Sequence, residues 1–505
     1  MFGNKITGAP SKFAASLLSV YSANALNGVL GVVAVPIGLR SLGPEGYGLF
    51  SLYLLMISYV LLADLGVSKH LLRLLSCSRD SRDGVDYLRT ALALYYGLSA
   101  AWFGLLPLLL WLVPAILFPV EPRYCAQLRW LTVIAVTEFA VGIPQSLIQT
   151  SALAKERFGD YSRFTLLSGV LRNSVIILGA LVFGSPCGLA AAMLARKAVD
   201  FCLAARILGG LPKAAWRPRF SRRDAAMMLA QSGTLSVAQV LYSSLMSVGS
   251  YLMNAHFGLY WLGIYRVAFD LAGKISFLSN GVGLVLFPKL AYAFRNEARR
   301  KSIALLLGPA LDVSWLFYCA LGAVAVMAAP HALPKIGVAN PDAIGLFVLI
   351  VIGLSLNCHG LVTNEIIQAS GHYRRNIVVT VSGLVIMIAV FSLSRWKAGP
   401  ASIGVGWIAA AVSIGVIADT VALRSLDIRW PFCAASGALK AVACGLCGLT
   451  LASYYHIAGG EIGLFGVIAL VGLLLRKALR LRTIGFGGAP SPVMATGGDA
   501  VTSLS

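Results

Sequence analysis

Long runs of apolar residues, separated by short polar segments, occupy most of the 505-residue chain. Apolar and polar positions do not alternate within a run, which favours helices over the strands of a membrane β-barrel. Most runs reach the roughly 17–25 residues that a helix needs to cross a bilayer. The pattern predicts fourteen spans, at residues 13–39, 47–68, 90–118, 130–151, 164–184, 187–208, 226–254, 259–288, 303–329, 342–368, 376–394, 401–423, 433–455 and 461–475.

Composition supports an all-α integral membrane protein. Hydrophobic residues make up 58% of the chain and charged residues only 12%, with a mean hydropathy of +0.81. A soluble domain carries about 25% charged residues. The net charge of +21 gathers in short segments on one side of the predicted spans, as in polytopic membrane proteins, so no nucleic-acid partner is expected. This asymmetry predicts that both termini are cytoplasmic.

Several classes of site are not expected. The nine cysteines are scattered, and the spacing typical of a zinc site or a disulfide framework is missing. No phosphate-binding loop sequence occurs, so ATP is not expected to bind in that way, and we expect no metal and no cofactor. The first apolar run is too long for a cleaved signal peptide.

A glycine-rich segment between the first two runs recurs later in the chain. Gly43 and Gly48 lie in SLGPEGYGLF, and Gly258 and Gly263 lie in FGLYWLGIYR, each 215 residues further on. Six predicted spans separate the two segments, so the second has the orientation of the first. The sequence therefore predicts a parallel repeat. Glycine permits a tight turn there and lets helices approach closely.

These segments carry a resemblance to a known family. The stretch SLGPEGYGLFSLYLLMISYVLLADLG resembles the start of bacterial polysaccharide flippases of the Wzx type, and FGLYWLGIYRVAFDLAGKISFLSNGVGLVLFPKLAYAF resembles their matching second-half region. The flippases belong to the multidrug/oligosaccharidyl-lipid/polysaccharide exporter superfamily. The resemblance implies two six-helix lobes around a cavity, and alternating access that moves a polyprenyl-diphosphate-linked oligosaccharide across the bacterial inner membrane.

The resemblance and the span pattern together predict the domain organisation. About fourteen transmembrane helices would form two parallel-repeat lobes and a terminal helix pair. The parts are an N-lobe at 1–212, a cytoplasmic linker at 213–225, a C-lobe at 226–424, a helix pair at 425–482 and a disordered tail at 483–505. The implied partners are the lipid-linked glycan, membrane lipid, and polysaccharide polymerase and export machinery.

Charged residues inside predicted spans are the candidate functional groups, because intramembrane charge is costly. One interpretation is a water-filled cationic cavity that binds the diphosphate, since arginine offers phosphate a planar fork of donors. The other is a set of neutralising ion pairs, because Arg266, Asp270 and Lys274, and also Arg196 and Asp200, share helix faces at a spacing of four. The candidate substrate-binding residues are Arg172, Arg196, Lys197, Arg266 and Lys274.

Two cations and three carboxylates stand out within this set. Arg172 and Lys197 have no acid four residues away, which makes them the strongest candidates for ligand contact. Glu138, Asp64 and Asp270 are candidates for ion coupling. A hydrogen-bonded buried acid is the alternative for Glu138, and a contact at the helix end is the alternative for Asp64.

Two rival functions share parts of this pattern. A drug or metabolite antiporter of the same superfamily would have the same lobes, but should favour an acidic cavity for cationic drugs. A membrane glycan polymerase needs catalytic residues in sizeable outer loops, whereas the predicted outer loops are short. We therefore expect a transporter and no catalytic residues.

Overall fold

The structure is a computed structural model. It describes residues 9–62, 67, 71–72, 74–75, 82–155, 157–274, 317–318, 320–336, 338, 340–369 and 373–425.

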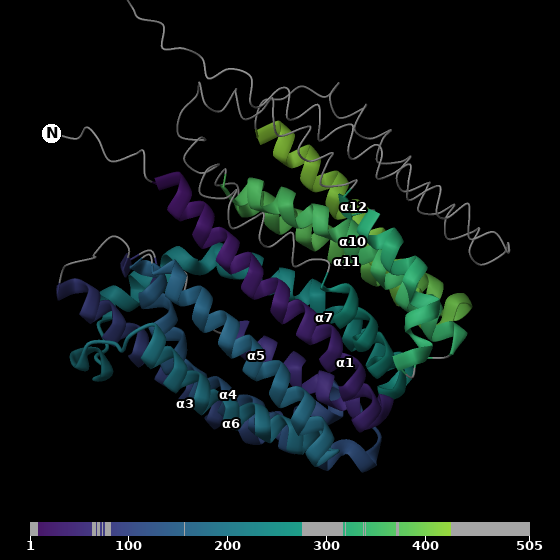
Figure 1. The fold of residues 1–505 in the computed structure, drawn as a ribbon, viewed down its shortest axis with the longest axis horizontal. Helices are drawn as coiled ribbons and strands as arrows, with labels where there is room; N and C mark the ends of the chain where they lie inside the picture. Colours follow the sequence, from purple (N-terminus) through teal and green to yellow (C-terminus); the bar gives the residue numbers. More distant parts are fainter. Residues whose placement is uncertain are drawn as a thin grey trace, which may run out of the picture.

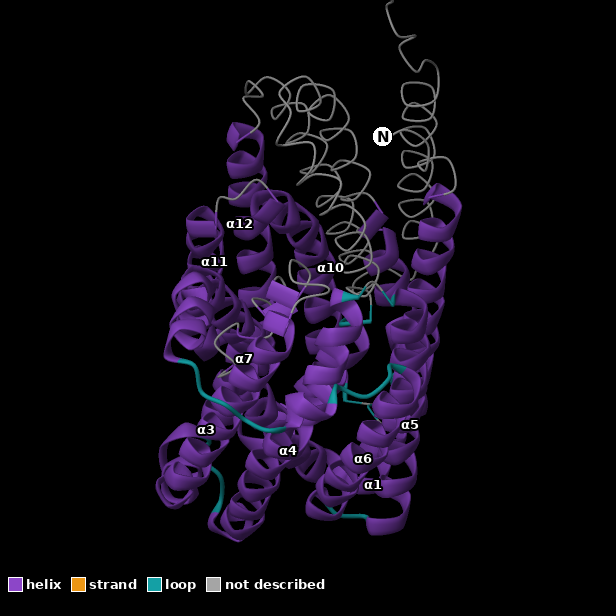
Figure 2. Ribbon diagram, turned by 90° about the vertical axis from the view of Figure 1, so that its left-hand side faces the viewer, coloured by secondary structure: helices purple, strands orange, loops and turns teal. Residues whose placement is uncertain are grey.

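Helices joined by short loops form all of the regular structure in these residues, with no β-strand (Figure 2). The α-helices are α1 (Ala9–Leu62), α3 (Arg82–Leu112), α4 (Pro122–Ala154), α5 (Phe158–Phe183), α6 (Pro186–Ile207), α7 (Arg222–Ala272), α10 (Pro341–Ala369), α11 (Tyr373–Ala398) and α12 (Ser402–Ser425). A π-helix, Val113–Leu117, continues α3, and short 3₁₀ helices occur at Lys213–Trp216, Pro334–Ile336 and Gly399–Ala401.

The predicted all-helical membrane protein is confirmed. Six helical stretches in the described part are long and apolar enough to cross a membrane, by length and composition. The helices follow the predicted spans from 13 to 254 and from 342 to 423. Spans 433–455 and 461–475, the second part of 259–288 and much of 303–329 lie outside the described residues, so the count of fourteen stays a prediction.

Two of the helices run through a pair of predicted spans and break at one glycine. In α1 the break is Gly43, with φ 70° and ψ 169°, and in α7 it is Gly258, with φ 80° and ψ −178°. A positive φ of this kind is open to glycine because it has no Cβ. The two breaks are 215 residues apart, so the glycine repeat of the sequence corresponds to one repeated backbone feature.

The helices pack as two groups that meet along α1 and α7 (Figure 1). We call α1 to α6 the first half and α7 to α12 the second half. Helix α1 packs against α4, α5 and α6, whereas α7 packs against α10 and α11. Contacts between α1 and α7 are the main connection between the halves.

The glycine repeat forms part of that connection. A methyl group on Gly48 would collide with the carbonyl oxygen of Leu259, and one on Gly263 would collide with the carbonyl oxygen of Pro44. Gly48 and Gly263 are 215 residues apart, and so are Pro44 and Leu259. The contact therefore pairs equivalent residues reciprocally, as a two-fold axis between the halves requires.

Further contacts join the halves at this end of the bundle, which we call the turn end because Gly43 and Gly258 lie there. The Asn254 side-chain amide donates to the Pro119 carbonyl oxygen at 2.9 Å. The rings of Phe118 and Tyr251 meet edge to face, with centroids 6.4 Å apart. The two halves are thus held together at the turn end by backbone, polar and aromatic contacts.

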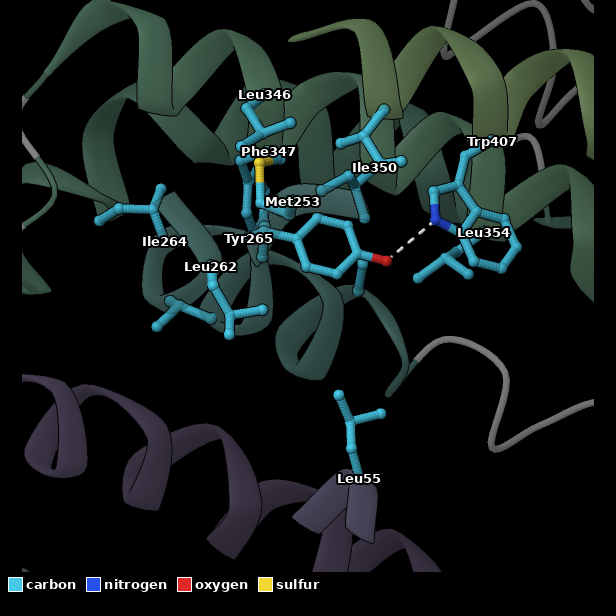
Figure 3. Packing of buried hydrophobic residues seen from close by; sticks show 14 of the residues in the cluster. Leu55, Met253, Leu262, Ile264, Tyr265, Leu346, Phe347, Ile350, Leu354 and Trp407 are labelled. Atoms are coloured by element: carbon cyan, nitrogen blue, oxygen red, sulfur yellow. Dashed lines mark hydrogen bonds between the residues drawn. The ribbon is translucent and has the colours of Figure 1, made fainter. Parts of the chain in front are cut away.

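A buried apolar cluster fills the second half and reaches α1 (Figure 3). Tyr265 of α7 and Trp407 of α12 are fully buried within it. The Trp407 indole N–H donates to the Tyr265 hydroxyl at 3.0 Å, which satisfies a buried donor. This packing fixes the second segment of α7, which carries three of the candidate charged residues.

Candidate functional site

Charged side chains from α4, α5, α6 and α7 meet in the interior of the bundle. All of the predicted substrate-binding cations are among the described residues, together with three carboxylates. The cations are Arg172 on α5, Arg196 and Lys197 on α6, and Arg266 and Lys274 on or just after α7, and the carboxylates are Glu138 on α4, Asp200 on α6 and Asp270 on α7.

Arg196 and Asp200 form an ion pair within α6. They are one helical turn apart, and the guanidinium Nη1 bonds to the carboxylate Oδ2. Both side chains are buried, Asp200 with 1% of its surface exposed. The structure thus places Arg196 in the ion-pair arrangement, and its contact with substrate stays a prediction.

Arg266 and Asp270 form a second pair of the same spacing on α7. The Arg266 Nη2 lies 2.8 Å from the Asp270 Oδ1. The other carboxylate oxygen accepts a hydrogen bond at 3.1 Å from the hydroxyl of Tyr47, on the second segment of α1. Asp270 therefore links the second half to the first.

Lys197 has an acidic partner on another helix. Its Nζ lies 3.5 Å from the Glu138 Oε1, while the other oxygen of Glu138 accepts a hydrogen bond from the Tyr53 hydroxyl. Glu138 is 4% exposed and therefore needs both contacts. The expectation that Lys197 is unpaired is true only along its own helix.

Arg172 and Lys274 remain without an ion pair to any residue that the structure describes. Arg172 is an exposed side chain near the middle of α5, within electrostatic range of Arg196, Asp200 and Asp270. The Lys274 ammonium lies in range of the Arg172 guanidinium and is repelled by it. One cation comes from each half, so an uncompensated positive site spans the two halves.

The packing around Lys274 involves the first half directly. A methyl group on Gly31 of α1 would lie 2.6 Å from the Lys274 Nζ and 3.7 Å from the Asn173 Oδ1. Asn173 donates through its amide nitrogen to the Gly169 carbonyl at 2.9 Å. The bare face of Gly31 thus gives the lysine head group its place beside α1 and α5.

Three polar groups of this cluster could not be found from the sequence. The hydroxyls of Tyr47 and Tyr53 bond to carboxylates 223 and 85 residues away, so no local spacing marks them. Asn173 is next to Arg172, which is the only signal it offers. Asp64 lies outside the described residues, and within those residues no group of three potential metal ligands occurs.

Comparison with known proteins identifies the family. The sequence profile described as "Polysaccharide biosynthesis protein" matches residues 39–332, which is more than half of the chain. The chain belongs to this family. A comparison with curated proteins finds no match.

Solved structures show the fold to which the polysaccharide biosynthesis protein is similar. The lipid II flippase MurJ, in an inward closed conformation, has a TM-score of 0.65 at 12% identity, over 91% of this chain and 99% of that chain. An inward-facing multidrug resistance MATE transporter of the MOP superfamily has a TM-score of 0.59 at 18% identity, over 84% of this chain and 99% of that chain.

A third solved structure differs in its pocket. This MOP superfamily transporter from Pyrococcus furiosus, described as having a binding pocket of reverse polarity, has a TM-score of 0.53 at 18% identity, over 84% of this chain and 96% of that chain. At these identities the likeness shows the fold alone. The protein therefore has the fold of the MOP superfamily transporters and is a multi-pass membrane protein.

Proposed function

We propose that the protein is a flippase that moves a polyprenyl-diphosphate-linked glycan across the bacterial inner membrane. The observation that carries this proposal is the positive site formed by Arg172 and Lys274, one cation from each half and neither with an ion pair among the described residues. Membership of a polysaccharide biosynthesis family and the fold shared with a lipid II flippase support it.

The chemistry of the site suits a diphosphate. A lone cation among membrane-spanning helices is costly, so its retention calls for a compensating anion. The Arg172 guanidinium can hold two phosphate oxygens at once, and the Lys274 ammonium adds a point charge from the other half. Binding would then draw the two halves together around the diphosphate.

Alternating access gives this arrangement a direction. The halves touch at the turn end through Gly48 and Gly263, and we assign that end to the periplasmic side from the predicted charge asymmetry. Both termini are then cytoplasmic, and the site is loaded from the cytoplasmic leaflet. The moving bodies would be the lobes at 1–212 and 226–424, joined by the linker 213–225.

Ion coupling and partners complete the proposal. Glu138 and Asp270 are the described candidates for coupling, together with Asp64. The helix pair at 425–482 and the tail at 483–505 keep their predicted roles. A polysaccharide polymerase and export machinery would act on the flipped glycan.

The test is made in the source bacterium with the gene deleted. We expect lipid-linked glycan to accumulate in the deletion strain and wild-type protein to relieve it. Arg172→Ala and Lys274→Ala should fail to relieve it at equal protein levels, because each removes a cation from the diphosphate site. Arg163→Ala and Lys155→Ala are matched controls, since both residues are exposed and lie near the other end of α5.

Two results would change the account. If no lipid-linked glycan accumulates, the lipid-linked cargo is wrong, and a drug or metabolite antiporter, which shares the fold, takes its place. If both alanine variants relieve accumulation fully, the flippase stands but the positive site is not its binding site.

A further inference from the structure

A second polar site lies inside the first half, away from the positive site between the halves. A cavity of about 230 Å³ opens among α1, α3, α4 and α6. At about 30 Å³ for each water, it has room for roughly seven waters or for one pyranose ring. Its polar lining comes from Tyr95, Glu138, Gln145, Ser146, Gln149 and Lys197.

One face of α4 supplies most of this lining. Glu138, Gly142, Gln145 and Gln149 follow one another at spacings of four, three and four, so they lie on the same side of the helix. Gly142 carries no side chain, and a methyl group there would lie 3.9 Å from the Lys197 Nζ. The glycine thus leaves the space that the surrounding polar groups face.

The cavity contains hydrogen-bonding capacity that the described part of the protein does not use. Gln145 is 8% exposed, and its carbonyl oxygen Oε1 is buried without a hydrogen-bond partner in that part. A buried amide oxygen left unpaired costs about 1–3 kcal/mol. A ligand or ordered water that donates to it removes this cost.

The charges of the cavity are already balanced. Lys197 pairs with Glu138, which also accepts a hydrogen bond from Tyr53. A ligand that brings its own charge would have to break this arrangement. A neutral molecule rich in hydroxyl groups would only add hydrogen bonds, and the rings of Tyr95 and Phe139 offer it an apolar surface.

We propose that this cavity binds one neutral sugar ring of the lipid-linked glycan. The inference rests on the proposed flippase function and deepens it, because it separates two subsites. The diphosphate is held between the halves at Arg172 and Lys274, and the sugar is read inside the first half by Gln145 and Gln149. Arg196 and Lys197, neighbours on α6, face the two subsites.

The test compares two kinds of lipid on the purified full-length protein in nanodiscs. The probes are undecaprenyl diphosphate and the same lipid carrying one glucose, galactose or N-acetylglucosamine, each measured by competition binding. We expect at least one sugar to tighten binding to wild type. Gln145→Leu and Gln149→Leu should each reduce that advantage about fivefold to tenfold, the effect of one lost hydrogen bond, and leave binding of the bare lipid unchanged.

Gln127→Leu is the matched control, because Gln127 lies on the same helix but is exposed outside the cavity. Unchanged binding of the bare lipid shows that each variant is folded. If no sugar tightens binding, or if the advantage survives in the Gln145→Leu, Gln149→Leu double variant, the sugar subsite is overturned while the flippase stands. If neither kind of lipid binds, the proposed function fails and the subsite fails with it.

Discussion

At the scale of single residues, the cations inside the bundle are of two kinds. Arg196, Lys197 and Arg266 each contact a carboxylate, whereas Arg172 and Lys274 have no such partner among the described residues. The first kind stabilises the fold by neutralising buried acids. The second kind leaves positive charge available to a ligand. The two kinds should therefore respond differently to substitution.

Asp200→Ala should destabilise the protein, because it leaves the buried Arg196 without its counterion. Loss of one partner of a buried ion pair costs on the order of 3–5 kcal/mol. The thermal melting temperature of the detergent-solubilised protein measures this loss. Asp160→Ala is the control, since its ion pair with Arg157 is partly exposed and contributes about 1 kcal/mol or less.

A double variant separates the missing charge from the missing contact. Arg196→Met with Asp200→Leu removes both charges and should recover most of the melting temperature that Asp200→Ala loses. A melting temperature for Asp200→Ala equal to that of wild type would contradict a buried structural pair.

Arg172→Ala should have the opposite profile. The side chain is exposed and has no ion pair with the described residues, so the melting temperature should stay within a degree or so of wild type. Transport should be lost, because the diphosphate loses its forked donor. A stability loss as large as that of Asp200→Ala would show that Arg172 is structural.

At the scale of helices, the broken helices α1 and α7 explain the glycine repeat. Gly43 and Gly258 supply the positive φ at each break, and Gly48 and Gly263 supply the close approach of one half to the other. A single 215-residue repeat thus encodes both a turn and an interface. Because the interface pairs equivalent backbone atoms, each half contributes equally to closing the turn end.

Gly48→Ala and Gly263→Ala should shift the protein toward a form open at the turn end. Each added methyl group meets a backbone carbonyl oxygen of the opposite half, which cannot move aside as a side chain can. Spin labels on the exposed residues Gln127 and Tyr260, in a background without native cysteines, report the separation by pulsed electron resonance.

We expect a longer-distance population in both variants and none in Gly97→Ala or Gly104→Ala, where a methyl group meets no atom within 4 Å. Identical distance distributions in wild type and all four variants would show that the glycine contact does not hold the halves together.

The sequence predicts local features of this architecture better than distant ones. Helix bounds followed the apolar runs closely, as for α5 and α6, because span length is fixed by bilayer thickness. The pairs Arg196–Asp200 and Arg266–Asp270 followed from helical spacing. The partner of Lys197 did not, since Glu138 comes from another helix and only tertiary packing brings the two together.

At the scale of the whole molecule, the two halves meet in contacts that differ along the bundle. The turn end is closed by Gly48 and Gly263, and the charged residues lie further from it. The positive site is built from both halves, so a bound diphosphate would couple their positions. The neutral cavity lies within the first half alone, so a bound sugar would move with that half.

The most direct test of this account is transport by the purified protein in liposomes. A fluorescent polyprenyl-diphosphate-linked saccharide is placed in both leaflets, and a membrane-impermeant quencher measures how fast the inner pool becomes accessible. We predict exchange by the wild-type protein, a rate at least about tenfold lower for Arg172→Ala, and no exchange of a phosphatidylcholine analogue. An absence of exchange, or equal rates for wild type and Arg172→Ala, would contradict a flippase that binds its substrate at this positive site.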